Sequence, residues 1–318
     1  MKKIKNYVQL IENTLARQDW DREPAQLYEP VSYILHLGGK RLRPALTLAA
    51  CELFNGPVEE ALMPAMAVEV FHNFSLVHDD IMDAAPLRRG QPTVHHKWDL
   101  NTGILSGDAM LVKAYQYVAM VEPAILPSVM RVFSQTALEV CEGQQYDMNF
   151  ENLPEVAEED YLEMIRLKTS VLLGCALKLG ALVANARPQQ ADDLYQFGVH
   201  IGIAFQIQDD ILDAFGDPEK FGKQNGGDIL QDKKTLLMIH ALQKAPEIEE
   251  LLGTAADPQK KVEAVKKVFE NSGALHHARK TMQDYFDQAI QYLEKAGGNP
   301  EIQGELKAFA NYLIIRDN

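Results

Sequence analysis

The chain has 318 residues, of which 47% are hydrophobic, so it can bury a large core in one large domain or two ordinary ones. Its formal net charge of −14 argues against a general nucleic-acid-binding surface. The three cysteines have no C-x-x-C spacing and form neither a disulfide framework nor an evident zinc site. This pattern fits a reducing cytosol and predicts a cytoplasmic protein.

Helical periodicity dominates the chain. Residues 60–83 have apolar side chains at i, i+3 and i+4 spacing, and the sequence lacks alternating segments rich in Val, Ile and Thr. No long apolar run follows the basic N-terminus, so no signal peptide is expected. The most apolar stretch, residues 171–186, is interrupted by Lys178 and predicts a buried helix rather than a membrane span. Similar helical patterns cover residues 103–120, 125–149, 157–186, 191–215, 231–244, 258–271 and 273–296.

Turn-forming residues separate these helical blocks, but no linker rich in Gly or Ser divides the chain. We therefore expect a single domain over residues 1–318. The predicted architecture is all-α, a large helical bundle around a deep central cavity.

The first candidate site is the segment GGKRLRP at residues 38–44. Gly38 and Gly39 allow unusual backbone dihedrals and close approach of the backbone, and three cations follow within four positions. A Walker loop needs a longer spacing and a following Ser or Thr, so this segment is not one. It predicts a diphosphate-binding loop, and the alternative is a helix-boundary loop with solvated charges.

The acidic segment DDIMD at residues 79–83 lies at the end of an apolar, helix-like stretch. In a helix Asp79 and Asp83 share one face and repel each other unless a cation lies between them. Hard cations such as Mg²⁺ prefer carboxylate oxygen, and Arg88 and Arg89 just downstream offer donors to phosphate. The alternative is a solvated helix end followed by a charged loop.

A second acidic segment, DDILD at residues 209–213, matches the first one 130 positions later. Two such faces opposed across a cavity would hold divalent cations, and these cations would hold a diphosphate. Lys223 and Lys233 lie downstream and can act as mobile point charges for phosphate. An EF-hand is excluded because its central Gly and distal Glu are not at the required positions.

Two further positions are ambiguous when taken alone. Lys168 and Thr169 lie inside the helical pattern of residues 157–186, where Lys can snorkel and Thr can bond to the preceding turn. A histidine on an apolar helix is more often a satisfied core residue than a ligand. His72, however, lies seven residues, about two turns, before Asp79 and so on the same face.

Together these segments resemble the trans-isoprenyl diphosphate synthase (polyprenyl synthetase) family, in particular its short-chain geranylgeranyl and farnesyl diphosphate synthases. The match keeps the family's order, with GGKRLRP at 38–44, DDIMD and RRG at 79–90, KT at 168–169, QIQDDILD at 206–213, and GK and GDILQDKKT at 222–235. The resemblance implies the all-α isoprenoid synthase fold and a homodimer. It also implies a Mg²⁺-dependent trans-prenyltransferase that condenses isopentenyl diphosphate with a dimethylallyl, geranyl or farnesyl diphosphate, without nucleic acid or a membrane span.

The resemblance further implies a role for each matching residue. Three Mg²⁺ ions per active site would be ligated by Asp79, Asp83 and Asp209 and supported, directly or through water, by Asp80, Asp210 and Asp213. The allylic diphosphate would be held by Arg88, Lys168, Thr169, Gln206, Lys223 and Lys233. Isopentenyl diphosphate would be held by Gly39, Lys40, Arg43, His72 and Arg89. The groups nearest the chemistry would be Asp79, Asp80, Asp83, Arg88, Lys168, Asp209 and Lys223.

One residue departs from the family's pattern, and three positions bear on product length. Asp232 stands where many relatives carry Gly, which leaves the geometry beside Lys233 open. In the family, a bulky aromatic five residues before the first Asp shortens the product, and Phe74 occupies this position here. Ser75 is next to it, and Phe71 lies about a turn deeper. We therefore expect a C15 to C20 product, with geranylgeranyl (C20) favoured.

Four alternatives remain at this point. The chain could be a longer-chain polyprenyl diphosphate synthase, or a non-catalytic subunit of a heteromeric prenyl synthase, although such subunits typically lose carboxylates that this chain keeps. A class I terpene cyclase shares an Asp-rich motif and Mg²⁺, but it binds one diphosphate and does not need the 38–44 segment. A purely structural helical protein has no reason to place six carboxylates and these cations in this pattern.

Overall fold

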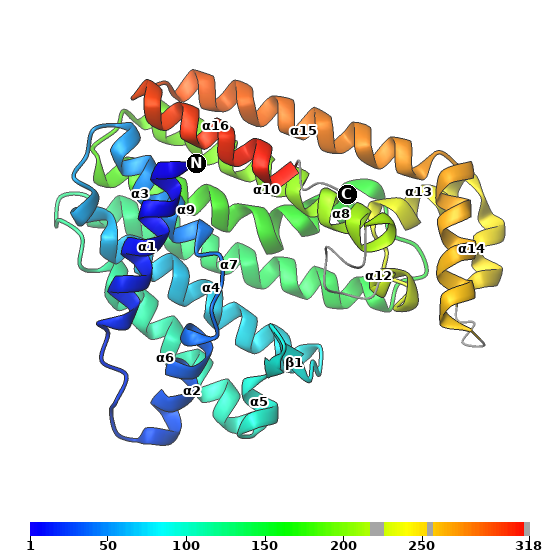
Figure 1. Cartoon of the computed structure of the whole chain (residues 1–318), viewed down its shortest axis with the longest axis horizontal. Helices are drawn as coiled ribbons and strands as arrows, with labels where there is room; N and C mark the ends of the chain where they lie inside the picture. Colours follow the sequence, from blue (N-terminus) through cyan, green and yellow to red (C-terminus); the bar gives the residue numbers. More distant parts are fainter. Residues whose placement is uncertain (217–225, 253–256, 315–318) are drawn as a thin grey trace. The chain divides into compact units, whose positions relative to one another are not determined.

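The structure is a computed structural model that describes residues 1–216, 226–252 and 257–314. Within these residues every regular element except one short hairpin is helical, so the predicted all-α class is confirmed (Figure 1). The chain divides into two compact units. Unit 1 comprises Met1–Thr136, Leu172–Tyr195 and Lys295–Leu306, and unit 2 comprises Ala137–Val171, Gln196–Glu294 and Lys307–Asn318. That residues 1–318 form a single domain stays a prediction.

Unit 1 contains the N-terminal helices and the first Asp-rich segment. The expected helical blocks 60–83 and 103–120 are confirmed as α4 and α6, with ends shifted by a few residues. The helices before residue 54 had not been assigned from periodicity. In chain order the elements are α1 Lys2–Ala16, α2 Ala25–His36, α3 Leu42–Leu53, η1 Val58–Ala61, α4 Leu62–Met82, β1 Leu87–Arg88, β2 Gln91–Pro92, α5 Val94–Lys97 and α6 Leu100–Val118.

Helices α4 and α6 pack closely because a glycine lies at their contact. A Cβ atom added at Gly107 would lie 2.2 Å from Nε2 of His78, so a larger residue would push the helices apart. The N-terminus of α6 is capped by Asp99, which accepts a hydrogen bond of 2.9 Å from the backbone N–H of Thr102. This packing supports the last turns of α4, which carry the first Asp-rich segment.

The remaining helices lie in unit 2 or contribute residues to both units. The C-terminal helix α16 had not been assigned from periodicity, whereas the blocks 125–149, 191–215, 258–271 and 273–296 correspond to single helices. The elements are α7 Leu126–Glu151, α8 Glu158–Ile165, η2 Arg166–Ser170, α9 Val171–Val183, α10 Pro188–Phe215, α12 Gly227–Leu230, α13 Leu236–Lys244, η3 Pro246–Leu251, α14 Pro258–Asn271, α15 Ala274–Ala296 and α16 Pro300–Ile314.

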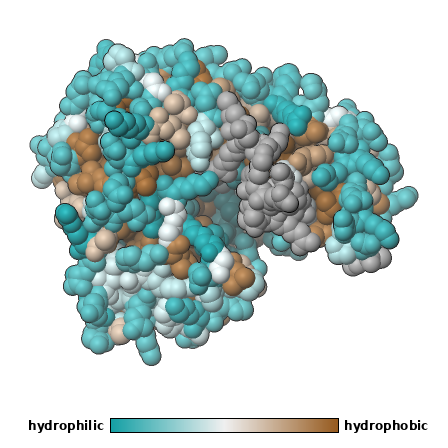
Figure 2. Space-filling view, viewed as in Figure 1, coloured by the Kyte–Doolittle hydropathy of each residue, from teal (hydrophilic) through white to brown (hydrophobic). Residues whose placement is uncertain are grey.

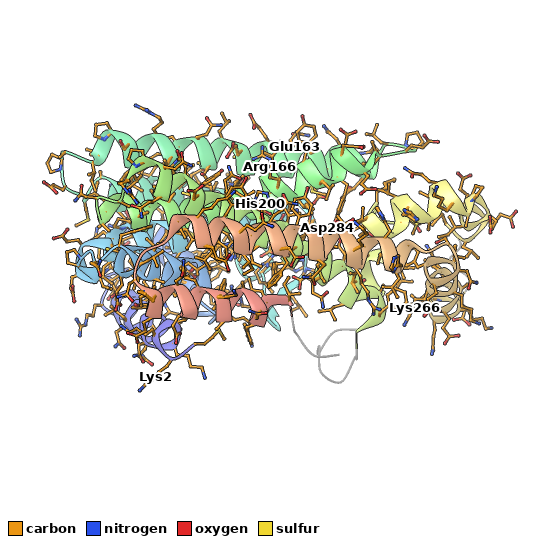
Figure 3. All side chains as sticks on the ribbon, turned by 90° about the horizontal axis from the view of Figure 1, so that it is seen from above. Lys2, Glu163, Arg166, His200, Lys266 and Asp284 are labelled. Atoms are coloured by element: carbon orange, nitrogen blue, oxygen red, sulfur yellow. The ribbon has the colours of Figure 1, made fainter. Side chains whose placement is uncertain are left out.

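The block expected as one helix over 157–186 is interrupted by a π-helical turn, η2. Glu163 and Arg166 form an ion pair of 2.7 Å at the junction of α8 and η2 (Figure 3). Within η2 the Ser170 hydroxyl donates to the carbonyl of Ile165 at 3.1 Å. Since π-turns insert one residue into a helix, the residues of η2 face differently from those of a regular helix, and they include Lys168.

The most apolar stretch of the chain is a buried helix, as expected. Residues 175–177 of α9 are completely buried, and Lys178 reaches Asp192 at 2.5 Å. In the parts of the chain that the structure describes, no helix combines the length and apolar character needed to cross a membrane. Hydrophilic residues cover most of the face drawn in Figure 2, in keeping with the large net charge.

Candidate active site

The first Asp-rich segment forms the end of α4, and its three carboxylates have different surroundings. Asp80 is 1% exposed, whereas Asp79 is partly exposed and Asp83 is exposed just after the last turn. The hairpin β1–β2 brings Arg88 back to this helix end. Its Nε donates to both Asp80 oxygens at 2.8 Å, and its Nη2 lies 3.6 Å from Asp79 Oδ2. The chain thus places Arg88 beside two carboxylates of the segment.

Burial raises the pKa of the Asp80 carboxyl, and the Arg88 guanidinium opposes this rise. Asp80 is therefore a buried anion that depends on its arginine. Asp79 and Asp83 lie one turn apart, and the backbone N–H of Asp83 donates to the Asp79 carbonyl at 2.9 Å. That Asp79 and Asp83 form a cation-binding face stays a prediction.

The 38–44 segment precedes and begins α3, and it meets three predicted substrate-binding residues. Gly38 and Gly39 have φ angles of 82° and 147°, which favour glycine. An Arg89 Nη group donates to the Gly38 carbonyl. Lys40 is exposed, and Arg43 Nη1 lies 3.4 Å from Nε2 of His72. The structure therefore brings His72 and Arg89 to this segment, to which Arg43 itself belongs.

Burial and the nearby cations both disfavour protonation of the His72 ring. Burial, first, and then the Arg43 and Arg89 guanidinium groups hold the pKa of His72 well below its ordinary value of 6.5. A neutral imidazole next to arginines can donate or accept a hydrogen bond without adding to the positive charge. This arrangement suits a site that has to hold an anion by several different groups.

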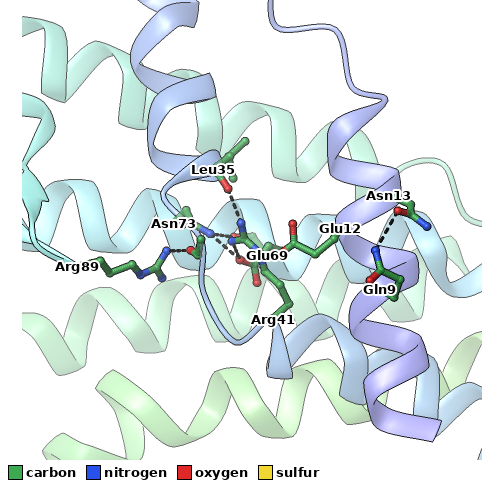
Figure 4. A network of polar contacts seen from close by, with 9 residues as sticks. Gln9, Glu12, Asn13, Leu35, Arg41, Glu69, Asn73 and Arg89 are labelled. Carbon is green, nitrogen blue, oxygen red and sulfur yellow. Dashed lines mark hydrogen bonds and ion pairs between the residues drawn. The ribbon is translucent and has the colours of Figure 1, made fainter. Parts of the chain in front are cut away.

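Arg41, the middle cation of the segment, differs from Lys40 and Arg43 because it is only 3% exposed. Its guanidinium is bound inside unit 1 to Glu12, Glu69 and the Leu35 carbonyl (Figure 4). Sequence reasoning counted Arg41 with the other cations and did not find this role. No local pattern could have revealed it, because the acidic partners are distant in the sequence.

In unit 2, η2 and α10 carry three of the predicted allylic-site residues, Lys168, Thr169 and Gln206. Lys168 Nζ lies 2.5 Å from Asp147 Oδ2, and the Thr169 hydroxyl donates to Gln206 Oε1 at 3.3 Å. The Gln206 amide in turn donates to Asp210 Oδ1 at 3.1 Å. Asp147, on α7, belongs to no recognisable motif and was missed by sequence reasoning.

The second Asp-rich segment also divides into buried and open carboxylates. Asp210 is 8% exposed and accepts hydrogen bonds from Gln206 and from the Tyr161 hydroxyl. Burial and the nearby Asp228 raise the pKa of Asp210 to about 8, against the effect of these two donors. Asp209 is partly exposed. Tyr161 was a second residue that sequence reasoning missed.

Asp213 is hydrogen-bonded to the segment that follows the second Asp-rich segment. The backbone N–H of Asp228, in α12, donates to Asp213 Oδ2 at 2.9 Å. Lys233 lies 3.6 Å from Asp228 Oδ1, close to this group. The predicted site residue Lys223 lies outside the described residues.

The structure explains how an aspartate fits at position 232. Asp232 has a φ of 52°, a left-handed conformation that a glycine adopts without strain. Its carboxylate pairs with Nζ of Lys261, on α14, at 2.7 Å. The added negative charge beside Lys233 therefore has a cation of its own.

The product-length candidates lie on α4 in a cluster of aromatic rings. The Phe74 ring lies 5.5 Å from that of Phe71 and 4.8 Å from that of His78. Phe71 packs in turn against Phe133 of α7, with ring centroids 5.5 Å apart. The Ser75 hydroxyl donates to the His72 carbonyl at 2.9 Å. Phe71 is thus a fixed core residue, and Phe74 stands between it and the Asp-rich end of the helix.

The donors in both segments suit a hard cation, although the protein alone does not assemble a complete set of ligands. Among residues 1–216, 226–252 and 257–314, no three His, Cys, Asp or Glu side chains are grouped so as to hold a metal. The candidate ligands are carboxylates, among them the partly exposed Asp79 and Asp209. Mg²⁺ is commonly held by one or two carboxylates together with water and phosphate, so the donor set fits this ion.

Comparison with known proteins agrees with this geometry. A family profile described as Polyprenyl synthetase matches residues 24–272. The geranylgeranyl diphosphate synthase of Methanosarcina mazei is 38% identical over 296 residues, which cover 92% of this chain and 91% of that protein. The chain belongs to the polyprenyl synthetase family. As a polyprenyl synthetase it is a trans-prenyltransferase, and the enzyme class predicted from the sequence is confirmed.

Other polyprenyl synthetases match over nearly their whole length. The geranylfarnesyl diphosphate synthase of Natronomonas pharaonis is 34% identical over 327 residues, covering 97% of this chain and 95% of that protein. A crystal structure of a geranylgeranyl pyrophosphate synthase has a TM-score of 0.95 at 45% identity and covers 100% of both chains. The polyprenyl synthase from Caulobacter crescentus CB15, complexed with calcium and isoprenyl diphosphate, has a TM-score of 0.86 at 26% identity and covers 99% and 98% of the two chains.

Proposed function

We propose that this chain condenses isopentenyl diphosphate with an allylic diphosphate in a Mg²⁺-dependent reaction whose main product is geranylgeranyl diphosphate. The observation that carries the proposal is the cluster of Arg43, His72 and Arg89 around the 38–44 segment. This cluster provides a diphosphate-binding group in addition to the Asp-rich segments. A prenyl diphosphate enzyme with one substrate has no need for it.

The open carboxylates of the two Asp-rich segments are the proposed ligands of the cation. Asp79 and Asp83 bind Mg²⁺ in unit 1, and Asp209 binds it in unit 2, with three ions per active site. The buried Asp80 and Asp210 support these ligands directly or through water. Asp213, which accepts a hydrogen bond from Asp228, has the same proposed role. The carboxylate-only donor set supports this assignment, as does the calcium reported with the Caulobacter crescentus enzyme.

The two substrates use different side chains. The groups proposed for the allylic diphosphate are Arg88, Lys168, Thr169, Gln206, Lys223 and Lys233. The groups proposed for isopentenyl diphosphate are Gly39, Lys40, Arg43, His72 and Arg89. Arg88 is supported by its place at the Asp-rich end of α4, and Lys168 by its place beside Asp147.

These roles suffice for the reaction. Mg²⁺ held by Asp79, Asp83 and Asp209 would supply positive charge that stabilises the leaving diphosphate. Arg88 and Lys168 donate to that diphosphate, and donors fixed before the reaction are the main source of such stabilisation. Arg43 and the neutral His72 hold isopentenyl diphosphate so that its alkene attacks the allylic carbon. After the C–C bond forms, a proton leaves, and the departed diphosphate accepts it because no side-chain base is assigned to this step.

Phe74 is the proposed limit of the growing chain, with Phe71 supporting it from a turn deeper and Ser75 beside it. The names of the relatives from Methanosarcina mazei and from the 45% identical crystal structure support a C20 product. The relative from Natronomonas pharaonis is named for the C25 product, so a longer chain is the second candidate.

The proposed enzyme is a homodimer. On α6 the side chains of Leu105 and Val112 are 59% and 58% exposed, and their seven-residue spacing puts them on one face. Ile104, next to Leu105, is 40% exposed. Exposed apolar side chains gathered on one helix face commonly mark a protein interface, and a second copy of the chain would cover this one.

One assay tests the reaction, the cation and the product together. The purified chain is incubated with isopentenyl diphosphate and each of dimethylallyl, geranyl and farnesyl diphosphate, and the dephosphorylated products are separated by chromatography. We expect C20 alcohol with Mg²⁺ and none in excess EDTA until Mg²⁺ is restored. Products of C25 or more would favour the longer-chain enzyme. A folded chain without any product would indicate a non-catalytic subunit.

A further inference from the structure

A buried ion pair joins Arg41 of the 38–44 segment, which carries part of the proposed isopentenyl diphosphate site, to Glu69 of α4. Arg41 Nη1 donates to Glu69 Oε1 at 2.5 Å, and the two side chains are 1% and 3% exposed. The Arg41 Nε donates to Glu12 Oε1 at 2.7 Å, and its Nη2 donates to the Leu35 carbonyl. One guanidinium thus joins α1, the end of α2 and α4, as Figure 4 shows.

Glu69, the anion of the pair, is also held by hydrogen bonds from a buried side chain. The Asn73 amide, itself completely buried, donates to both the carbonyl and Oε1 of Glu69, at 2.8 and 2.9 Å. Glu69 and Asn73 lie on either side of His72 in the sequence, three residues before it and one after it. The network is therefore built into the same stretch of α4 that presents His72.

Arg89 also contacts the 38–44 segment. Arg89 donates to the Gly38 carbonyl, and its guanidinium lies against Gly39, where an added Cβ would be 3.2 Å from its nitrogens. Arg41 adopts a left-handed φ of 45°, and α3 starts at the next residue. The chain from Gly38 to Arg41 is thus held at both ends, with Lys40 exposed between them.

The arrangement has an electrostatic purpose besides packing. Lys40, Arg43 and Arg89 are like charges that repel one another when they converge on one anion site. A buried ion pair is a poor source of stability, because removing both charges from water costs about as much as their attraction returns. Its clearest benefit is to fix one geometry, and here the fixed segment carries groups that have to converge.

We propose that Arg41 and Glu69, held by Asn73, are positioning residues that set the affinity for isopentenyl diphosphate without touching it. The inference rests on the proposed function, because it assigns the 38–44 segment to that substrate. It predicts that damage to the pair weakens binding of isopentenyl diphosphate and leaves the allylic substrate nearly unaffected.

The test measures binding of each substrate separately by calorimetry in two variants, Arg41→Lys and Glu69→Gln. Lys keeps the charge but lacks the fork that reaches three acceptors, and Gln keeps the shape but removes the anion. We expect Kd for isopentenyl diphosphate to rise about 10-fold or more, as is typical when a group that orients a ligand-binding residue is lost. Kd for an unreactive allylic diphosphate analogue should change less than about 2-fold. Equal weakening of both would overturn the proposal.

A double variant separates positioning from stability. Arg41→Met with Glu69→Met removes both charges and keeps apolar volume, so the melting temperature should return towards that of the wild type. Affinity for isopentenyl diphosphate should remain low. A double variant that is stable and binds this substrate like the wild type would show that the pair is only structural.

If the variants of the buried Arg41 and Glu69 do not fold, two milder variants test the positioning role. Asn73→Ala weakens the support of Glu69, and Glu12→Gln removes a partner that is 41% exposed. Each should raise Kd for isopentenyl diphosphate alone, by about 2- to 5-fold. No change in either would overturn the proposal. Gln9→Ala, on the same helix as Glu12 but bonded to Asn13, is the matched control and should bind both substrates normally (Figure 4).

Two other variants test the proposed function separately from the positioning role. Lys40→Ala and Arg43→Ala should lose isopentenyl diphosphate binding directly. If they do while the Arg41 and Glu69 variants bind normally, only the positioning role fails. If Lys40→Ala and Arg43→Ala bind the substrate like the wild type, the assignment of the segment itself is wrong.

Discussion

Adjacent aspartates in each acidic segment have opposite surroundings. Asp80 and Asp210 are buried and bonded to Arg88 and Tyr161, whereas Asp79 and Asp209 remain partly exposed. Consecutive residues on a helix point in directions about 100° apart, so a pair of aspartates divides between the helix face and the core. The exposed member of each pair is the one expected to meet a cation.

The first prediction concerns these exposed members. Asp79→Ala and Asp209→Ala should each lower turnover by about three orders of magnitude, because contacts that strengthen with charge on the leaving group are lost. Steady-state kinetics with saturating Mg²⁺ measures the effect. Asp284→Ala, which removes an exposed carboxylate on α15, is the control and should turn over normally (Figure 3). A loss of only a few-fold in a folded Asp79→Ala variant would contradict the assignment.

The second prediction follows from the lowered pKa of His72. The folded protein resists protonation of this ring, so stability falls as the pH drops below the ordinary value of 6.5 and is unaffected above it. His72→Asn should therefore show a smaller fall in melting temperature than the wild type between pH 7.5 and 5.5. His36→Asn, an exposed position on α2, is the control. Identical pH profiles for His72→Asn and the wild type would refute the prediction.

The third prediction concerns product length. Phe74→Ala frees space for another prenyl unit, whose burial is favourable at ~25 cal/mol per Å². The product distribution should shift to longer chains while the first condensation continues. Ser75→Phe should shift it towards C15 or shorter. Both are measured by chromatography at equal substrate ratios, and an unchanged distribution for Phe74→Ala would place the limit elsewhere.

Among the elements, η2 determines where Lys168 and Thr169 lie. The π-turn exists where α7 comes unusually close, since a Cβ at Gly143 would be 2.2 Å from the backbone nitrogen of Lys168. The hairpin β1–β2 does the same for Arg88, which it returns to the end of α4. In both cases an irregular segment between helices determines where a cationic side chain lies, Lys168 in η2 and Arg88 in the hairpin.

The fourth prediction tests the first of these irregular segments. Gly143→Ala should force α7 and η2 apart, lower the free energy of unfolding by about 1–3 kcal/mol and raise KM for the allylic substrate. The control is Gly304→Ala on α16, where an added Cβ meets nothing within 4 Å. It should be neutral or stabilising by about 0.5–1 kcal/mol, since Ala favours helix. Equal stability and KM in Gly143→Ala and the wild type would show that η2 tolerates displacement.

For the whole molecule, α6 carries several of the exposed apolar side chains among the described residues. A net charge of −14 keeps copies of the chain apart unless specific contacts outweigh the repulsion. Leu105 and Val112 offer such contacts. If α6 pairs with a second copy of the chain, its apolar contacts have to outweigh this charge repulsion.

The fifth prediction is that light scattering gives twice the chain mass for the wild type. The double variant Leu105→Asp and Val112→Asp should give the mass of one chain, because four charges would face one another across the interface. Asp284→Asn, which changes an exposed carboxylate on α15 rather than on α6, is the control and should remain a dimer. A wild type with the mass of one chain would contradict the prediction.

The sequence by itself determined the helical class, the order of the functional segments and the family. These features depend on spacing within one or two turns, such as Asp79 to Asp83, or on short runs of specific residues, which a linear reading captures. It also identified Arg43, His72 and Arg89, which the structure brings together. The first and last helices in the sequence, α1 and α16, were missed from the periodicity, although both bury apolar residues.

Only the tertiary structure decided which of the charged residues are buried. Arg41 and Lys40 are neighbours of similar chemistry, yet Arg41 meets Glu69, 28 residues away. Asp210 meets Tyr161, 49 residues away. A charge becomes a structural or a functional group according to the partners that distant segments bring to it, because burial without a partner is too costly. Local sequence does not contain that information.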